Sequence, residues 1–347
     1  MDWMIYGANG YTGELIARVA VARGLRPILA GRSEKPVEEL ARALNLQYRI
    51  FSCEDPQEIA KSLQDISLVL HCAGPFVRTY RPMIQACLES QTHYLDVTGE
   101  ILVFENLLRR SKEFKQAGIV VMPGVGFDVY PTDCLAASLK KELPDATHLR
   151  LGFQSLGPVG PGSLITMLQG FYVRCAIRED GEIRLIPPGS KVRSIAFQDK
   201  KVLAMAIPWG DVSTAYHSTK IPNIEVYIPA TRLKVLLMRF IGWLSPGLLG
   251  SIGNFLEGLI RKQVSGPKGS VLEEKGAFLY GEVLNAAGKR VEKKYKCPNV
   301  YSVTVDAALI CVNDVLQGKV EPGAWTPSKA LGDNALQRLK GLEPLHR

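Results

Sequence analysis

Seven residues near the N-terminus form a glycine-rich turn that suits a phosphate group. The run Gly7-Ala8-Asn9-Gly10-Tyr11-Thr12-Gly13 follows a short apolar segment and opens an amphipathic helical pattern. Glycines permit a tight turn close to a ligand, and the first turn of a helix offers free amides and the positive end of its dipole. This context indicates a dinucleotide pyrophosphate site, although the spacing is Gly-x-x-Gly-x-x-Gly rather than Gly-x-Gly-x-x-Gly. We expect six residues of the turn to contact the cofactor: Gly7, Asn9, Gly10, Tyr11, Thr12 and Gly13.

The end of the second predicted strand favours NADP(H) over NAD(H). Arg32 follows this strand 19 residues after Gly13, near the position where an acidic residue binds the ribose 2′-hydroxyl of NAD. An acidic residue there would repel a 2′-phosphate, whereas an arginine would hold it by charge-assisted hydrogen bonds. Ser33 adds a hydroxyl donor beside it.

Small and polar residues also follow the fourth, fifth and sixth predicted strands, in segments 72–76, 96–100 and 124–133. The carboxyl ends of parallel strands meet at one edge of a sheet, and ligands bind there. Asp96 and Thr98 equally suit the structural role of helix caps. We expect the cofactor to contact Ala73, Gly74, Pro75, Phe76, Thr98 and Gly99, and we consider Asp128 and Tyr130 as catalytic candidates.

A second polar stretch, 208–223, reads PWGDVSTAYHSTKIPN and includes Tyr216 and His217. Either side chain is able to supply a proton to the substrate atom that does not receive hydride. A structural loop with satisfied hydroxyls is the alternative interpretation. The five histidines are far apart and lack ligand-spaced acids or cysteines, so we expect no metal site.

Two different patterns of secondary structure position these residues. Apolar runs alternate with helical patterns over residues 1–145, which predicts an α/β domain with a doubly wound parallel sheet, a Rossmann fold. Residues 146–300 read as several strands, including a hairpin of 278–284 with 291–296, and predict an α+β substrate or dimerisation domain. Residues 301–347 begin with a helical pattern that we expect to return to the Rossmann domain.

Composition and charge restrict the class of protein. A chain of 347 residues with 46% hydrophobic and 22% charged residues is neither disordered nor collagen-like nor a coiled coil. Seven scattered cysteines argue against a disulfide framework, and no secretory signal is evident, so we expect a cytoplasmic protein. Residues 1–150 hold 17 basic and 18 acidic residues, a net of −1, whereas 151–347 hold 25 and 16, a net of +9.

The basic half suggests an acidic partner. Segment 233–260 is strongly apolar between basic flanks, and it suits a buried or interface hairpin, a lid over an apolar substrate, or a membrane contact. The basic run 289–296 lies on a strand pattern and suits an acidic carrier protein or lipid headgroups. It lacks any nucleic-acid-binding module, so we expect no nucleic acid partner.

The motifs together resemble the saccharopine dehydrogenase-like oxidoreductase family, which includes the trans-acting enoyl reductases. They are GANGYTG at 7–13, AGR at 30–32, CAGPF at 72–76, YLDVTGE at 94–100 and GFDVYPTD at 126–133, with 208–217 and 323–329 in the later part of the chain. The resemblance implies an NADP-binding Rossmann domain, a substrate domain and a reductase role.

No cluster of arginines that would grip an amino-diacid is evident, and the apolar segment favours a less polar substrate. We therefore expect an NADP(H)-dependent reductase of a C=C or C=N bond in an apolar or carrier-bound substrate, acting as a homodimer. The alternative is a non-catalytic scaffold that senses the cofactor or associates with a membrane, because no proton donor is unmistakable.

Overall fold

The computed structural model describes residues 2–157, 175–242 and 275–345. The chain forms two compact units: the first comprises Met1–Tyr130 with Tyr301–Arg338, and the second Pro131–Val300 with Leu339–Arg347. The boundary therefore falls 15 residues before the expected one. Helix α7 (Tyr130–Glu142) belongs almost entirely to the second unit, because Leu135 and Leu139 pack tightly against Gly281 of that unit's sheet.

The first unit is built on a seven-stranded sheet in which every strand pair is parallel. Its strand order is β15-β6-β5-β4-β1-β2-β3, which contains the Rossmann order and places the switch point between β1 and β4. The expected doubly wound α/β fold is confirmed. The strands are β1 (Trp3–Tyr6), β2 (Ile28–Gly31), β3 (Tyr48–Ile50), β4 (Leu68–His71), β5 (His93–Asp96), β6 (Val120–Met122) and β15 (Gly323–Ala324).

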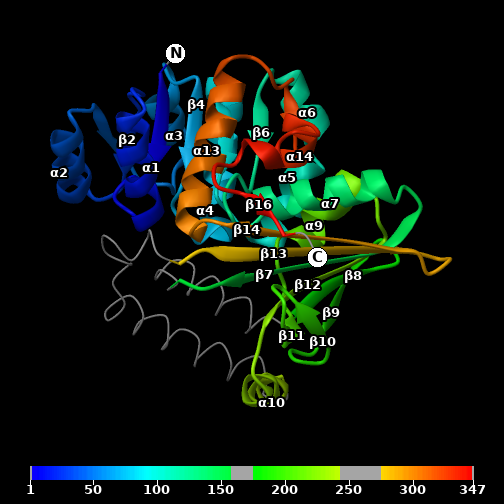
Figure 1. Cartoon of the computed structure of the whole chain (residues 1–347). Coiled ribbons are helices and arrows are strands. Elements are labelled where there is room, and N and C mark those ends of the chain that lie inside the picture. The colour runs from blue at the N-terminus through cyan, green and yellow to red at the C-terminus, as the bar shows by residue number, and fades with distance from the viewer. Residues whose placement is uncertain (1, 158–174, 243–274, 346–347) are drawn as a thin grey trace. The chain divides into compact units, whose positions relative to one another are not determined.

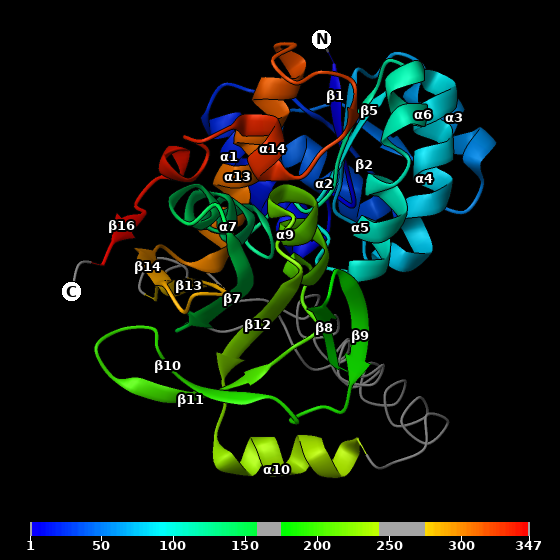
Figure 2. The ribbon, with the colours of Figure 1, turned by 90° about the vertical axis from the view of Figure 1, so that its right-hand side faces the viewer.

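Helices cover both faces of this sheet, with α1 and α13 on one face and α3, α4 and α6 on the other (Figures 1 and 2). The four residues of β1 and of β4 are all buried, as expected for strands covered on two sides. The helices are α1 (Tyr11–Ala22), α2 (Glu34–Leu44), α3 (Pro56–Leu63), α4 (Phe76–Ser90), α5 (Ile101–Leu108), α6 (Ser111–Gln116), α13 (Val300–Leu316) and α14 (Pro327–Leu331).

The C-terminal part of the chain completes the first unit. Tyr301–Arg338 supplies α13, the edge strand β15 and α14. Arg23 forms an ion pair with Asp306 of α13, and the Tyr130 hydroxyl donates to the Ala335 carbonyl at 2.9 Å. These contacts join segments that are far apart in the sequence.

The second unit contains a largely antiparallel nine-stranded sheet within the described residues. Its main order is β10-β11-β12-β7-β13-β14-β16, and β8 pairs with β12 and β9. The predicted hairpin is present as β13 and β14, which pair from Ala277↔Cys297 to Leu284↔Arg290. The strands are β7 (Ala146–Ser155), β8 (Cys175–Glu179), β9 (Glu182–Ile186), β10 (Val192–Ala196), β11 (Lys201–Ala206), β12 (Asn223–Pro229), β13 (Ala277–Asn285), β14 (Arg290–Cys297) and β16 (Glu343–Pro344).

Two further helices belong to the second unit, α9 (Asp211–Thr219) and α10 (Arg232–Ile241). Helix α10 accounts for the start of the apolar segment 233–260; residues 243–260 lie outside the described part of the chain. Across the residues that the structure describes, none of the helices combines the length and the apolar character needed to cross a bilayer.

Candidate functional site

The glycine-rich turn occupies the carboxyl end of β1, at the switch point of the parallel sheet. Gly7 has a φ of +81°, and a Cβ on it would lie 2.9 Å from both the Cβ and the backbone nitrogen of Ala73. The amides of Gly7 and Ala8 donate to the Ala30 carbonyl at 2.8 and 3.0 Å, which ties the turn to β2. The turn therefore needs glycine at position 7 for both conformation and space.

The third glycine lets α1 approach the turn. A Cβ on Gly13 would lie 2.3 Å from the Gly7 carbonyl oxygen and 3.0 Å from the Cα of Ala8. Gly10 caps α1 in an extended conformation and provides no side-chain hydrogen bond to the first turn. The backbone amides in the first turn of α1 are therefore available to a phosphate, which is the arrangement that binds dinucleotide pyrophosphates.

Helix α1 also presents Tyr11 and Thr12 in its first turn. The Tyr11 ring meets the Tyr301 ring edge-on, with centroids 4.7 Å apart. Burial raises the pKa of the Tyr11 hydroxyl to about 12, so this side chain stays neutral. Both residues lie in the first turn of α1, and their contacts with the cofactor stay predictions.

The end of β2 places Arg32 and Ser33 at the surface of the first unit. Both side chains are exposed, and Ser33 is the N-cap residue of α2 without a side-chain capping bond. A Cβ on Gly31 would lie 3.0 Å from the Asn9 side-chain oxygen, so the glycine-rich turn and the end of β2 are adjacent. Arg32 and Ser33 thus follow a strand end that adjoins the turn, and their contact with a 2′-phosphate stays a prediction.

The loop after β4 brings Ala73 to the turn, whereas the Phe76 side chain packs into the core. Ala73 contacts Gly7 as described above, whereas the Phe76 side chain is 8% exposed and packs edge-on against His71. The Gly74–Pro75 peptide bond is cis. Ala73 is therefore adjacent to the turn, while the Phe76 side chain belongs to the core; contacts of Gly74 and Pro75 with a cofactor stay predictions.

His71, at the end of β4, is fully buried and neutral. Its Nε2 lies 2.8 Å from the Thr79 hydroxyl, which itself donates to the Ala73 carbonyl at 2.9 Å. Since that hydroxyl proton is used, the hydroxyl oxygen accepts from Nε2–H. Burial lowers the pKa of His71 to about 3, so this histidine anchors the loop and carries no charge near neutral pH.

Glu100 has a structural role that the sequence reasoning missed. Its two carboxylate oxygens accept from the amides of Phe76 and Val77 at 2.8 and 2.7 Å, which caps the N-terminus of α4. Burial raises the pKa of Glu100, and these two hydrogen bonds oppose the rise. A carboxylate already fills this helix end, so it is not a second phosphate site.

Asp96 holds the loops after β5 and β6 together. Its carboxylate accepts from the Tyr94 hydroxyl at 2.7 Å and from the amides of Thr98 and Gly124 at 3.0 and 2.9 Å. Burial raises the pKa of Asp96 to about 7 despite these bonds. Thr98 is also buried, and its hydroxyl accepts from the Glu100 amide at 3.1 Å. These contacts favour structural roles for both residues.

The two catalytic candidates of the first unit differ in their surroundings. The Asp128 carboxylate lies against Gly99, where a Cβ would come within 3.0 Å of it, and burial raises its pKa to about 7. Tyr130 is completely buried with its hydroxyl bonded to Ala335. Asp128 thus lies at the carboxyl edge of the sheet, whereas Tyr130 is positioned as a core residue.

The other two candidates, Tyr216 and His217, lie on α9 of the second unit. Two cations lie over the Tyr216 ring, with Arg178 and Lys220 at 4.2 and 5.1 Å from its centroid. Arg178 is 5% exposed and donates to the carbonyls of Val212 and Gly181 at 2.8 and 2.7 Å. This packing favours a structural role for Tyr216, while His217 is half-buried beside it.

The second unit assembles a cluster of arginines that the sequence did not reveal. Glu282 of β13 is 1% exposed, and it pairs with Arg150 of β7 at 2.6 Å, Arg193 of β10 at 3.7 Å and Arg290 of β14. Glu225 of β12 approaches Arg150 at 3.5 Å. These arginines face glutamates of their own sheet, so the expectation that no arginine cluster grips an amino-diacid substrate stays a prediction.

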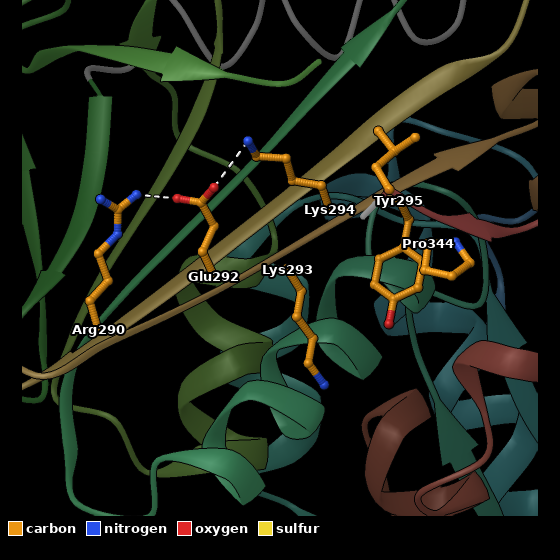
Figure 3. A pocket seen from close by; sticks show the side chains of 7 residues that line it. Arg290, Glu292, Lys293, Lys294, Tyr295 and Pro344 are labelled. Carbon is orange, nitrogen blue, oxygen red and sulfur yellow. Dashed lines mark hydrogen bonds and ion pairs between the residues drawn. The ribbon is translucent and has the colours of Figure 1, made fainter. Parts of the chain in front are cut away.

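The basic run 289–296 forms β14 and is extensively ion-paired. Together with Pro344 and Leu345, Arg290 and residues 292–295 line a pocket of about 570 Å³. Figure 3 shows Glu292 between Arg290 and Lys294, and Lys294 is 3.0 Å from this carboxylate. Lys293 pairs instead with Glu142 of α7 at 2.5 Å. The neighbouring acids offset much of the positive charge, and the acidic carrier partner stays a prediction.

No group of three or more histidine, cysteine or acidic side chains able to hold a metal ion occurs in the described ranges.

A parallel sheet in Rossmann order, a glycine turn at its switch point and an exposed arginine after β2 define a dinucleotide-binding protein. Residues 3–122 match the family model of the saccharopine dehydrogenase NADP binding domain. The resemblance inferred from the motifs is confirmed, and so is NADP(H) as the cofactor of this domain family.

Curated relatives share modest identity with parts of the chain. A saccharopine dehydrogenase-like oxidoreductase of Rattus norvegicus is 26% identical over 220 residues, which cover 55% of this chain and 51% of the relative. A trans-acting enoyl reductase of Mycobacterium tuberculosis is 29% identical over 159 residues, covering 42% and 37%. A lipid droplet localized protein of Caenorhabditis elegans is 27% identical over 175 residues, covering 46% and 41%. The matches thus span about half or less of these relatives' lengths.

The fold of the whole chain also has a solved counterpart. Apo saccharopine dehydrogenase (L-Glu forming) from Saccharomyces cerevisiae superposes with a TM-score of 0.67 over 99% of this chain and 98% of that chain. The sequence identity is 10%, so the likeness establishes the fold and no more.

Proposed function

We propose that this protein is an NADP(H)-dependent reductase of a C=C or C=N bond in a relatively apolar or carrier-bound substrate. The observation that carries the proposal is the turn in which Gly7 contacts Ala73 while Arg32 lies exposed after β2. Bound NADPH would supply a hydride. Residues of the chain would bind the phosphates of NADPH and deliver a proton to the atom of the C=C or C=N bond that does not receive the hydride. Membership of residues 3–122 in an NADP-binding family, and relatives named as oxidoreductases, support this function.

Arg32→Ala is expected to weaken NADPH binding about 10- to 100-fold and to change NADH binding little. A hydrogen bond to a charged group contributes roughly 1.5–3 kcal/mol, and only NADPH carries the 2′-phosphate. Fluorescence titration of the variant with both cofactors measures this selectivity. Lys35→Ala, an exposed cation on the first turn of α2, is the matched control and should leave both affinities unchanged. Equal losses for both cofactors would contradict the role of Arg32.

We further propose that Asp128 is the proton donor. Its pKa of about 7 keeps a large fraction protonated near neutrality, and only the protonated form is an acid catalyst. The rate should therefore be highest below pH 7 and fall as the pH rises through 7. With a 2-enoyl thioester as substrate, Asp128→Asn is expected to lower kcat about 100-fold. The variant should also lack the decrease in rate as the pH rises through 7.

Binding of NADPH to Asp128→Asn provides the control, because loss of a proton donor should leave cofactor affinity intact. Conversely, a variant that keeps the wild-type pH profile would exclude Asp128 as the donor. Failure of the wild-type protein to oxidise NADPH with any enoyl or imine substrate, despite normal binding, would favour a non-catalytic cofactor-sensing scaffold.

Localisation and oligomeric state are also part of the proposal. We propose a cytoplasmic homodimer that associates peripherally with lipid surfaces; the localisation stated in the name of the C. elegans relative supports the lipid association. Light scattering on the purified chain tests the dimer.

A further inference from the structure

Among the described residues, the contacts of helix α10 with the second unit come from one side of the helix. It begins at Thr231, whose hydroxyl accepts from the Lys234 amide at 3.2 Å. Val235 is its buried residue, at 5% exposure, and Arg239 donates from Nε to the Gly189 carbonyl at 2.9 Å. A Cβ on Gly189 would lie 2.9 Å from the Val235 carbonyl, so the loop after β9 lies close to this side of the helix.

The opposite side of α10 is an exposed apolar stripe. Leu233, Leu236, Leu237 and Phe240 are 76%, 60%, 53% and 67% exposed. Their spacing of i, i+3, i+4 and i+7 puts all four on one helix face. Single exposed apolar residues are ordinary, but four contiguous ones on one face mark an interaction surface. Figures 1 and 2 both show α10 at the margin of the second unit, beyond β10 and β11.

Basic side chains flank this stripe. At 100° per residue, Arg232 and Lys234 fall on its two sides, each about a quarter turn from its centre. Both are exposed, and α10, whose sequence is RLKVLLMRFI, contains no acidic residue. An apolar face between lysine and arginine side chains is the pattern of a helix that lies in the plane of a membrane interface.

We propose that α10 binds a lipid surface that carries anionic headgroups. The apolar stripe enters the boundary between headgroups and acyl chains, and Arg232 and Lys234 contact the headgroups. A second copy of the chain fits this face less well, because a twofold contact pairs the stripe with itself and brings like charges together. This inference rests on the peripheral lipid association proposed above and names the element that binds. Its test is separate from that of the reductase activity, because α10 belongs to the second unit and the nucleotide-binding turn to the first.

Co-flotation of the full chain with phosphatidylcholine vesicles, with and without phosphatidylserine, tests the proposal. We expect the wild type to float with vesicles that contain phosphatidylserine. The double variant L236D/L237D should bind about 100-fold more weakly, since each leucine loses its apolar burial. The variant R232E/K234E should lose about tenfold or more on anionic vesicles only, because each cation contributes by attraction to anionic lipid.

Leu102→Asp is the matched control, because Leu102 is a 64% exposed leucine on α5 of the first unit. It should float like the wild type, and unchanged NADPH binding by all variants shows that they fold. Absence of flotation by the wild type would overturn the proposal, as would flotation of L236D/L237D at the wild-type level. Dissociation of an oligomer by L236D/L237D without any vesicle binding by the wild type would instead make this face a subunit contact.

Discussion

Replacement of Gly13 by alanine is expected to abolish NADPH binding and to destabilise the first unit by about 3 kcal/mol, at the upper end of overpacking costs. The added Cβ would lie 2.3 Å from the Gly7 carbonyl oxygen and 3.0 Å from the Cα of Ala8. Both are backbone atoms of the turn itself, so no side chain is able to move aside. The strand and helix would have to separate at the site where the phosphates bind. Urea unfolding and NADPH titration of the variant measure the two effects.

Gly24→Ala is a control for this substitution. Gly24 has a φ of +78°, but a Cβ there meets no atom within 4 Å. Alanine at position 24 should cost only the backbone strain of a positive φ, about 1 kcal/mol, and leave NADPH binding unchanged. If Gly13→Ala bound NADPH nearly as well as the wild type, the turn described here would not be the cofactor site.

The nucleotide-binding part of the site was predictable because its determinants are local. The glycine-rich turn and the residue after β2 belong to one βαβ unit, whose geometry fixes their relative positions. The fold of the first unit followed from the same alternation of strands and helices. The sequence did not reveal that Glu100 caps α4, since the carboxylate lies 23 or 24 residues from the amides it binds. It likewise left the role of Asp96 open between a cap and a ligand contact.

The second unit was less predictable because its determinants are not local. Parallel pairing of β12 with β7, and antiparallel pairing of β7 with β13, places Arg150 between Glu225 and Glu282. No local pattern encodes that register, because each strand alone reads as an ordinary amphipathic segment. The exposure of α10 is also a tertiary property: the apolar segment 233–260 was open to three interpretations, a buried or interface hairpin, a lid and a membrane contact.

The Glu282 cluster gives the second large expected effect. Glu282→Gln should lower the free energy of unfolding of the second unit by about 2 kcal/mol, less than the roughly 3–5 kcal/mol of a fully buried pair, because the arginines left behind are 20%, 35% and 48% exposed. The substitution keeps the size of the side chain but removes the negative charge that faces Arg150, Arg193 and Arg290. Urea unfolding, with hydrogen exchange of β13 peptides to locate the effect, measures the loss.

The size of this effect depends on burial rather than on the number of ion pairs. Glu182 forms a comparable pair with Arg184 at 3.4 Å but is 73% exposed, so Glu182→Gln should cost less than about 1 kcal/mol. A double variant separates the effect of charge from the effect of packing. Arg150→Leu should destabilise the Glu282→Leu variant far less than it destabilises the wild type, because in the Glu282→Leu variant it removes an arginine charge that has already lost its partner Glu282. Equal costs for Glu282→Gln and Glu182→Gln would show that the cluster is hydrated and contributes little to the stability of the second unit.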